Sequence, residues 1–384
     1  MTTILILYAS LGAGHLNAAR ALTEAFLQYP DVEVLTQDAL EYASAIYRSS
    51  ITQIYKQLSE RIPTLYKAIY EGTDGDDVEE SLDGNLSVAR LEFPFFRKLE
   101  DLVTETNPNI IISVQQIPSR LIQLLKKKNN LSTPHYVVVT DAIAHSSWLN
   151  YEIDAYFLPS EIGVDMLIQR GADPKRLHVT GIPIKSEVLE PKNQEQMRSR
   201  YNIPLDQPVI TVFGGGLNPQ RIKIILTDFL TVSTPITLVV IAGRSDTLLE
   251  AIKDLTDNEQ VKFVKLGSIN YVDDMIVASD LIITKAGGLI TSEILARGVP
   301  MVIIDPIPGQ EEQNADVLSA SGAGIQIRLP EMVAQTVMYL LKYPERLAQM
   351  RQAALATGKP NAAHNIASFI LNDVHSKGEE SFVK

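Results

Sequence analysis

The chain has 384 residues and no cysteine, so it is long enough for two domains of ordinary size and excludes disulfides, thiol catalysis and cysteine-ligated metals. Hydrophobic residues make up 45% and charged residues 21%, a globular balance, and no apolar run reaches the roughly 18–20 residues of a membrane span. The net charge of −12 argues against nucleic-acid binding. Because no signal-peptide pattern precedes the first strand and the chain has no cysteine, we expect a cytoplasmic protein.

The first predicted element is a short apolar strand at Ile4–Tyr8. It is followed by the loop Ala9-Ser10-Leu11-Gly12-Ala13-Gly14-His15 and by an amphipathic helix through Tyr29. A strand, a glycine loop and a helix in this order open a doubly wound α/β half. The loop lacks the GxGxxG spacing of a dinucleotide site. His15 is either a functional group or a helix N-terminal histidine with no chemistry.

The stretch Tyr42–Phe96 differs in composition from the strands and helices before it, since it is rich in Tyr and Ile with interspersed Arg and Lys. Amphipathic helices of this kind can lie in a membrane interface, and they can equally pack on the first domain. Within the stretch, Glu71–Gly84 is acidic and contains no basic residue. It predicts a mobile, solvated loop, because the acids lack the EF-hand spacing of a calcium site.

Core strands are predicted at Ile110–Val114 and Tyr136–Thr140, and the second runs into Asp141-x3-His145-x2-Trp148. Asp141 would stand at the carboxyl end of a strand, where open α/β sheets place ligand contacts. The alternative is a polar loop with capping residues.

A second doubly wound half begins with the predicted strand Val209–Phe213 and the glycine loop Gly214-Gly215-Gly216-Leu217-Asn218, whose N–H groups can meet a diphosphate. The next strand, Ile236–Ile241, ends in Ala242-Gly243-Arg244. Asp273 and Asp274, after Tyr271-Val272, predict a helix N-terminus rather than a metal site.

The most informative stretch is Thr284–Ala315. An apolar strand stops at Ala286-Gly287-Gly288 and a helix follows, so unpaired N–H groups and the positive helix end can bind a phosphate. Glu293 lies one turn into this helix, where a carboxylate can accept from two vicinal hydroxyls, as on a ribose. A Pro-rich turn then leads to Gln310-Glu311, polar side chains that suit a polyhydroxylated ligand.

Three motifs carry a family resemblance: SLGAGH-x2-AA from Ser10, VVVTD-x3-H-x2-W from Val137, and GG-x3-SE followed by PGQE-x2-NA from Gly287. They resemble the processive diacylglycerol glucosyltransferases and monogalactosyldiacylglycerol synthases. The N-acetylglucosaminyltransferase that makes the peptidoglycan lipid precursor is similar more distantly.

The resemblance implies an α/β protein of the GT-B fold, with two Rossmann-like doubly wound domains facing across a cleft. The expected parts are an acceptor domain at 1–183, a linker at 184–207, a UDP-sugar domain at 208–365, and at 366–384 a C-terminal helix that packs back toward the first domain and ends in a frayed tail.

The resemblance also implies roles for individual residues. His15 is the expected general base, with Asp141 as its helper or rival, and His145 and Trp148 would contact the acceptor. The residues expected at the UDP-sugar are Gly14, Gly215, Gly216, Arg244, Tyr271, Val272, Gly287, Gly288, Leu289, Ile290, Glu293, Gln310, Glu311 and Asn314.

The implied function is inverting transfer of a hexose from a UDP-sugar to a diacylglycerol-type lipid, by an enzyme peripherally associated with the inner membrane. The UDP-sugar is a co-substrate, and neither a metal nor another cofactor nor a nucleic acid is expected. Three alternatives stay open: another hydrophobic or polyprenyl-linked acceptor, an epimerisation like that of UDP-N-acetylglucosamine 2-epimerase, and a UDP-sugar sensor without turnover.

Overall fold

A computed structural model of the chain describes residues 1–382, except for the side chains at positions 13, 55, 56, 59–61 and 378–382. The chain forms two compact units. Unit 1 comprises Met1–Ser186, Pro308–Gln313 and Lys359–Lys384, and unit 2 comprises Glu187–Ile307 and Asn314–Gly358. The end of the predicted frayed tail, residues 383 and 384, lies outside the described residues.

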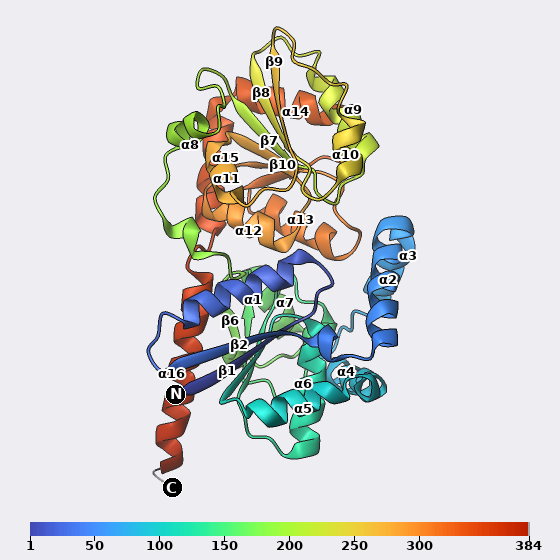
Figure 1. Ribbon diagram of the computed structural model, residues 1–384, viewed down its shortest axis with the longest axis vertical. Coiled ribbons are helices and arrows are strands. Elements are labelled where there is room, and N and C mark those ends of the chain that lie inside the picture. Colours follow the sequence, from blue (N-terminus) through green and yellow to red (C-terminus); the bar gives the residue numbers. More distant parts are fainter. Residues whose placement is uncertain (383–384) are drawn as a thin grey trace. The chain divides into compact units, whose positions relative to one another are not determined.

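Unit 1 is built on a six-stranded parallel sheet in the order β2-β1-β3-β4-β5-β6 (Figure 1). Its strands are β1 (Thr2–Tyr8), β2 (Val32–Asp38), β3 (Ile110–Ser113), β4 (His135–Val138), β5 (Ala155–Leu158) and β6 (Leu177–Val179). Its helices are α1 (Ala13–Phe26), α2 (Ala45–Arg61), α3 (Pro63–Gly72), α4 (Val78–Glu92), α5 (Arg97–Thr106), α6 (Gln116–Asn129), α7 (Glu161–Gln169) and α16 (Ala362–Phe382).

Helices cover both faces of this sheet, which explains why its central strands are apolar at almost every position. Ile4 and Ile6 of β1 point to one face, where they pack with residues of α1 and α16. Leu5 and Leu7 point to the other face, where they pack with residues of α5 and α6. This alternation is the two-residue period of an extended strand buried on both sides.

The helices α2, α3 and α4 interrupt the strand–helix alternation between β2 and β3. In Figure 1, α2 and α3 (blue) extend beyond the sheet of unit 1 and its covering helices, and α3 contains no buried residue. The prediction of a mobile loop at Glu71–Gly84 is wrong. Since the Asp77 side chain accepts from the N–H of Glu80 at 3.0 Å, α4 has a capped start at Val78.

Unit 2 contains a second six-stranded parallel sheet, in the order β12-β11-β10-β7-β8-β9. Its strands are β7 (Val209–Phe213), β8 (Ile236–Ile241), β9 (Val261–Leu266), β10 (Leu281–Thr284), β11 (Met301–Ile303) and β12 (Gly324–Gln326). The remaining helices are α8 (Gln194–Arg200), α9 (Pro219–Phe229), α10 (Asp246–Ala251), α11 (Val272–Ala278), α12 (Gly288–Ala296), α13 (Gln310–Ala320), α14 (Glu331–Lys342) and α15 (Pro344–Thr357).

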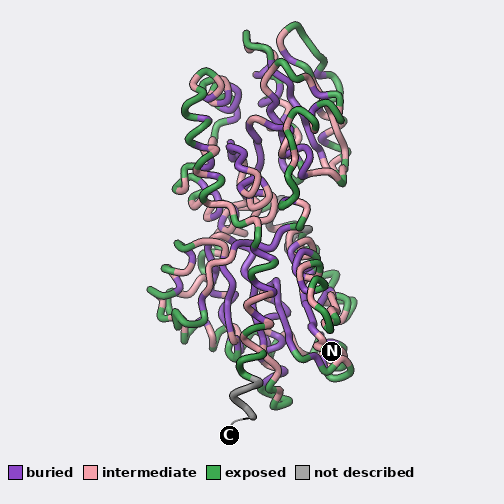
Figure 2. The backbone as a smooth tube through the Cα atoms, turned by 90° about the vertical axis from the view of Figure 1, so that its left-hand side faces the viewer, coloured by how far each residue is buried: buried purple, intermediate pink, exposed green. Residues whose placement is uncertain are grey.

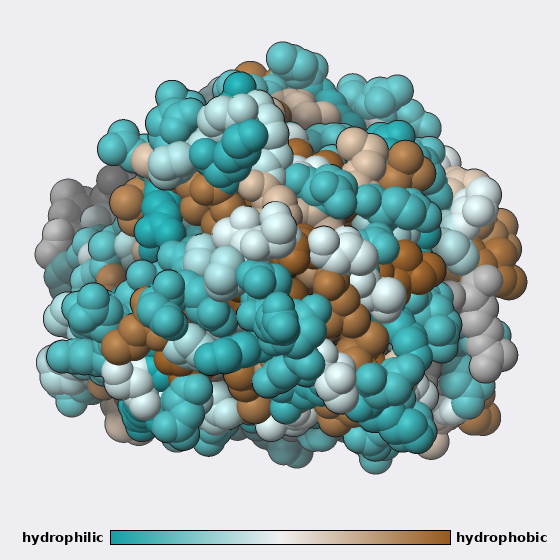
Figure 3. Space-filling model, turned by 90° about the horizontal axis from the view of Figure 1, so that it is seen from above, coloured by the Kyte–Doolittle hydropathy of each residue, from teal (hydrophilic) through white to brown (hydrophobic). Residues whose placement is uncertain are grey.

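Both sheets form the cores of their units, and Figure 2 shows their strands as buried and the outward sides of the helices as exposed. Among residues 1–382, no helix combines the length and the apolar composition that crossing a membrane requires. On the face seen in Figure 3, hydrophobic side chains are interspersed among hydrophilic ones, as on most globular surfaces.

The predicted fold class, an α/β protein of two Rossmann-like doubly wound domains, is confirmed. In unit 1 the chain proceeds from β1 to β2 on one side, and β3 lies on the other side of β1. In unit 2 the chain likewise proceeds from β7 to β8 on one side, and β10 lies on the other side of β7. Such switch points leave a crevice outside the carboxyl ends of the strands, and open α/β sheets bind their ligands there.

Candidate active site

His15 lies at the switch point of unit 1, in the first turn of α1. Gly12, the residue before this helix, has a φ of 142°, which a residue with a side chain rarely adopts. The Nδ1 atom of His15 lies 3.0 Å from the carbonyl oxygen of Val114 and 3.2 Å from the hydroxyl oxygen of Thr140. The loops after β1, β3 and β4 therefore meet at one imidazole ring.

These contacts determine which nitrogen of His15 can accept a proton. A carbonyl oxygen only accepts, so Nδ1 carries the hydrogen and donates it to Val114, and Nε2 keeps its lone pair. Burial lowers the pKa of His15 to about 4, although the hydrogen bond to Val114 opposes the shift. The ring is therefore neutral at physiological pH, the state that a general base requires.

Asp141 follows Thr140 in the same loop, and only 2% of its surface is exposed. Its Oδ2 accepts from the indole Nε1 of Trp148 at 3.3 Å, and its Oδ1 accepts from the side-chain amide of Gln310, which belongs to unit 1. Burial raises the pKa of Asp141 to about 6, while these two hydrogen bonds oppose the shift and the charge of Glu311 adds to it. The carboxyl group thus titrates near neutral pH.

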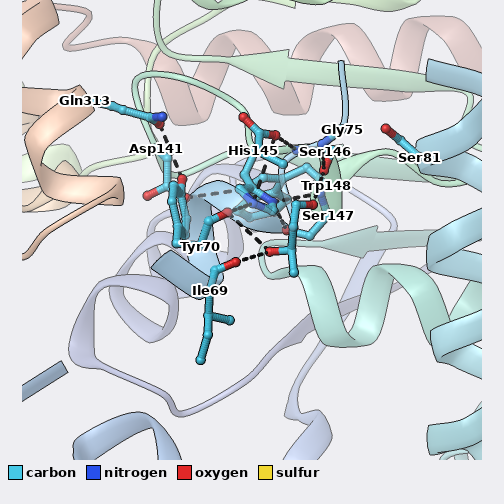
Figure 4. Close-up of polar contacts among 12 residues, drawn as sticks. Ile69, Tyr70, Gly75, Ser81, Asp141, His145, Ser146, Ser147, Trp148 and Gln313 are labelled. Atoms are coloured by element: carbon cyan, nitrogen blue, oxygen red, sulfur yellow. Dashed lines mark hydrogen bonds and ion pairs between the residues drawn. The ribbon is translucent and has the colours of Figure 1, made fainter. Parts of the chain in front are cut away.

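His145, three residues before Trp148, contacts α3 (Figure 4). Its Nε2 lies 2.8 Å from the carbonyl oxygen of Tyr70, and the two rings lie with their centroids 4.4 Å apart. Its Nδ1 accepts from the N–H of Ser147 at 3.0 Å. Burial lowers the pKa of His145, which favours the neutral ring.

Asp74 joins the same loop to the end of α3. It accepts from the N–H of Ser146 at 2.7 Å and forms two parallel hydrogen bonds with Arg170, of 3.1 and 3.0 Å. The Ser146 hydroxyl donates to Thr73 and accepts from the N–H of Gly75. Although burial opposes it, the bonds from Arg170 and Ser146 lower the pKa of Asp74. We call Asp74, Ser146 and Arg170 the Asp74 clasp.

The two residues predicted to contact the lipid acceptor, His145 and Trp148, are buried rather than exposed at the surface. Trp148 is completely buried in the apolar cluster around β4 and β5, and its indole N–H donates to Asp141. His145 is 4% exposed. Both residues support the loop that contains Asp141, and their contact with an acceptor stays a prediction.

The glycine loop of unit 2 follows β7. Gly216 has a φ of 79°, which favours glycine, and the N–H of Leu217 donates to the carbonyl oxygen of Gly214 at 3.1 Å. The side chain of Asn218 accepts from the N–H groups of Gln220 and Arg221, so it caps α9. Since the N–H of Gly214 donates to Ile241, the N–H groups of Gly215 and Gly216 stay the candidates for a ligand contact in this loop.

The second phosphate candidate is the N-terminus of α12, after β10. Gly287 precedes this helix and supplies no side-chain cap, so the N–H groups of Gly288, Leu289 and Ile290 have no partner within the helix. Asn314 is buried, and its side-chain amide donates to the carbonyl oxygen of Ala286 at 3.0 Å. Asn314 thereby fixes the turn that leads into α12.

The predicted uracil contact, Tyr271-Val272, stands at the start of α11. The ring of Tyr271 stacks on that of Tyr201, with centroids 4.4 Å apart and planes 18° from parallel. Asp273 and Asp274 are in the first turn of this helix, so the predicted helix N-terminus is confirmed. Both acids pair with Lys192. Within the part of the chain that the structure describes, no group of three or more His, Asp or Glu side chains could hold a metal ion.

The other predicted donor residues are distributed over both units. Glu293 is partly buried in α12, and Arg244 is exposed after β8. Gly14 and the first residues of α13, Gln310 and Glu311, belong to unit 1. The turn before α13 contains Asp305, whose φ is 43° and whose Oδ2 accepts from Arg221 at 2.7 Å.

The sequence interpretation overlooked Lys285 and the Asp74 clasp. Lys285 directly follows β10, and its Nζ lies 3.7 Å from the position that a Cβ atom on Gly216 would take. A signal for Lys285 existed, since it stands between a predicted strand end and the GG-x3-SE motif. No local pattern indicates the clasp, because its members are far apart in the chain.

Comparison with known families agrees with this geometry. Residues 15–184 match the family model of monogalactosyldiacylglycerol synthase, and residues 193–357 match that of the glycosyl transferases group 1. The chain is a glycosyltransferase. The predicted resemblance to monogalactosyldiacylglycerol synthases and processive diacylglycerol glucosyltransferases is confirmed by these matches and by the curated relatives of this glycosyltransferase.

The processive diacylglycerol beta-glucosyltransferase of Bacillus cytotoxicus is 27% identical to this glycosyltransferase over 97% of the chain and 94% of the relative. MurG of Acinetobacter baumannii has a TM-score of 0.61 at 15% identity, covering 97% of this chain and 100% of that one. UDP-GlcNAc 2-epimerase from Neisseria meningitidis, bound to UDP-GlcNAc, has a TM-score of 0.63 at 12% identity with the same coverage. At these identities the two structures show the fold alone, so the second does not favour epimerisation.

Proposed function

We propose that this glycosyltransferase moves a hexose from a UDP-sugar to the hydroxyl group of a diacylglycerol-type lipid, with inversion at the anomeric carbon. The observation that carries the proposal is the lone pair on Nε2 of His15, which the bond between Nδ1 and Val114 leaves available at the switch point of unit 1. The choice of lipid and donor is supported by relatives named diacylglycerol glucosyltransferases over 97% of the chain.

The reaction is a direct displacement at the sugar. The acceptor oxygen attacks C1 as the bond between C1 and the phosphate oxygen breaks, so the configuration inverts. His15 Nε2 takes the acceptor proton, and a positioned base of this kind contributes roughly 10²–10⁴-fold. Asp141, whose carboxyl group is buried in the loop after β4, orients the acceptor or balances the charge of the protonated imidazole.

In this proposal residues 1–183 accept the lipid, residues 208–365 bind the donor, and residues 184–207 link them. The N–H groups of the glycine loop and of α12 receive the diphosphate, so the UDP-sugar needs no metal. Glu293 accepts hydrogen bonds from the ribose, and the backbone at Tyr271 and Val272 contacts the uracil. The first residues of α13 form hydrogen bonds with the sugar hydroxyls. The proposed donor residues are Gly14, Gly215, Gly216, Arg244, Tyr271, Val272, Gly287, Gly288, Leu289, Ile290, Glu293, Gln310, Glu311 and Asn314.

A lipid acceptor requires access to a membrane surface, and we propose peripheral attachment to the cytoplasmic face of the inner membrane. The helices α2 and α3 are the best candidates for the contact. Ile46 is 78% exposed, and Ile62, Leu65 and Ile69 are each about half exposed. Apolar side chains on protruding helices can enter the interface while the polar face stays in water.

The first prediction concerns His15. His15→Ala removes the proton acceptor, so transfer from UDP-glucose or UDP-galactose to diacylglycerol falls by roughly 10²–10⁴-fold, while the affinity for UDP stays within about twofold. The measurements are thin-layer analysis of labelled lipid products and calorimetry with UDP.

The matched control is His364→Ala, which alters an exposed histidine of α16 and keeps full activity. Full transfer activity in His15→Ala contradicts the base assignment. Absence of any heat with UDP or UDP-hexoses on folded wild-type protein contradicts the donor class.

A further inference from the structure

The crevice at the switch point of unit 2 contains a lysine to which the family motifs give no role. β7 and β10 pair directly, with Ile210 opposite Leu281 and Val212 opposite Ile283. The loops that follow these strands therefore leave the same sheet edge side by side. Lys285 is the first residue after β10.

The side chain of Lys285 reaches across the crevice to the glycine loop after β7. Its Cε and Nζ each lie 3.7 Å from the point at which a Cβ atom of residue 216 would stand. Gly216 has neither a Cβ atom nor an ordinary φ, so the backbone there is open to the ammonium group. The ammonium group thus lies beside the glycine loop, on a residue three positions before α12 begins.

The backbone on both sides of Lys285 is held in place. The preceding residue, Thr284, is 1% exposed, and its hydroxyl donates to the carbonyl oxygen of Lys285 at 3.2 Å. The following residue, Ala286, is completely buried, and its carbonyl oxygen accepts from Asn314. A partly buried side chain on this fixed backbone brings its charge to one place, as a binding residue must.

The charge of a nucleoside diphosphate exceeds what peptide dipoles supply. A helix N-terminus is equivalent to about half an elementary charge, and the N–H groups of a glycine loop also contribute partial charges. A lysine ammonium adds a full charge and suits phosphate as a point charge. Arg244, one of the proposed donor residues, is exposed after β8, whereas Lys285 is partly buried.

We propose that Lys285 binds the diphosphate of the sugar nucleotide and stabilises its departure. When the bond between C1 and the phosphate oxygen breaks, its electron pair goes to that oxygen, and the ammonium group offsets the added negative charge. The acceptor oxygen takes its place on C1 and its proton goes to His15. This inference rests on the proposed function, because it takes the donor to bind in unit 2.

Calorimetry with uridine, UMP and UDP tests the proposal on the full chain. Lys285→Met weakens UDP binding by roughly 10- to 100-fold, as expected for the loss of a charge-assisted contact, and leaves uridine binding within about twofold. Lys285→Arg keeps the charge and recovers part of the UDP affinity. Lys262→Met, which removes an exposed lysine of β9, is the matched control and binds all three ligands as the wild type does.

The ligand series separates this inference from the proposed function. Binding of UDP by wild-type protein with an unchanged ratio of UDP to uridine affinity in Lys285→Met overturns the role of Lys285 alone. An equal loss of uridine and UDP binding also overturns it, because it indicates a distorted site rather than a missing phosphate contact. Failure of the wild type to bind UDP overturns the proposed function first.

Discussion

His15 is partly buried and Asp141 is buried, and burial moves their pKa values in opposite directions. Because burial disfavours the charged form, it lowers the pKa of His15 to about 4 and raises that of Asp141 to about 6. Between these values His15 is neutral while Asp141 is still largely protonated. Above pH 6 His15 is neutral and Asp141 is a carboxylate, the protonation states that the proposed proton abstraction from an alcohol uses.

This difference predicts which residue controls activity in acid. The acid limb of kcat/KM lies near pH 6, because protonation of Asp141 removes the carboxylate while His15 stays neutral to about pH 4. In Asp141→Asn the remaining activity is lower and its acid limb moves toward pH 4. The measurement is a pH profile of lipid glycosylation for both proteins. An acid limb that stays near pH 6 in the variant assigns it to another group.

At the scale of elements, the position of α3 depends on polar contacts. The helix has no buried residue, so little apolar packing holds it. The Asp74 clasp joins its end to the Asp141 loop and to α7, through the bidentate bonds of Arg170 and the N–H of Ser146. The clasp therefore couples α3, part of the proposed lipid contact, to the loop that contains Asp141, a proposed catalytic residue.

Breaking the clasp is expected to loosen α3. Arg170→Leu leaves Asp74 without its cation, which costs about 1–3 kcal/mol locally, so amide hydrogen exchange in α3 accelerates and the KM for the lipid rises. The affinity for UDP changes by less than about twofold. The control is Lys128→Ala, which removes the ion pair with Glu100 on the surface of unit 1 and costs under about 1 kcal/mol. Unchanged exchange in α3 rules out this role.

At the scale of the whole molecule, charge and apolar exposure point to different kinds of membrane contact. The net charge of −12 disfavours attachment by attraction to anionic lipids, whereas the exposed apolar side chains of α2 and α3 favour shallow insertion. Apolar insertion is insensitive to salt, and electrostatic attachment is not.

Vesicle flotation distinguishes these contacts. The protein is expected to float with neutral phosphatidylcholine–diacylglycerol vesicles at low and at high salt, and the double variant Ile46→Asp, Leu65→Asp is expected to lose at least half of the bound fraction. The matched control places the same charges on unit 2, in Leu329→Asp, Met332→Asp, where the two residues are 58% and 50% exposed. Equal flotation of both variants excludes α2 and α3 as the contact.

The sequence by itself determined the parts of this protein that depend on local chemistry. Apolar strands followed by glycine loops and amphipathic helices predicted both doubly wound halves, and the glycines at 12 and 216 have the positive φ that only glycine adopts easily. The motifs around His15, Asp141 and Gly287 placed these residues at strand ends because a strand end, a loop and a helix start are adjacent in the chain.

Only the tertiary structure decided what depends on long-range contacts. The bond between His15 and Val114 exists because β3 pairs with β1, and Lys285 reaches Gly216 because β10 pairs with β7. The acidic segment at Asp74 is ordered because Arg170 and Ser146 satisfy it, although its composition resembles a solvated loop. Strand order and burial set these contacts, and neither can be read from the neighbours of a residue in the chain.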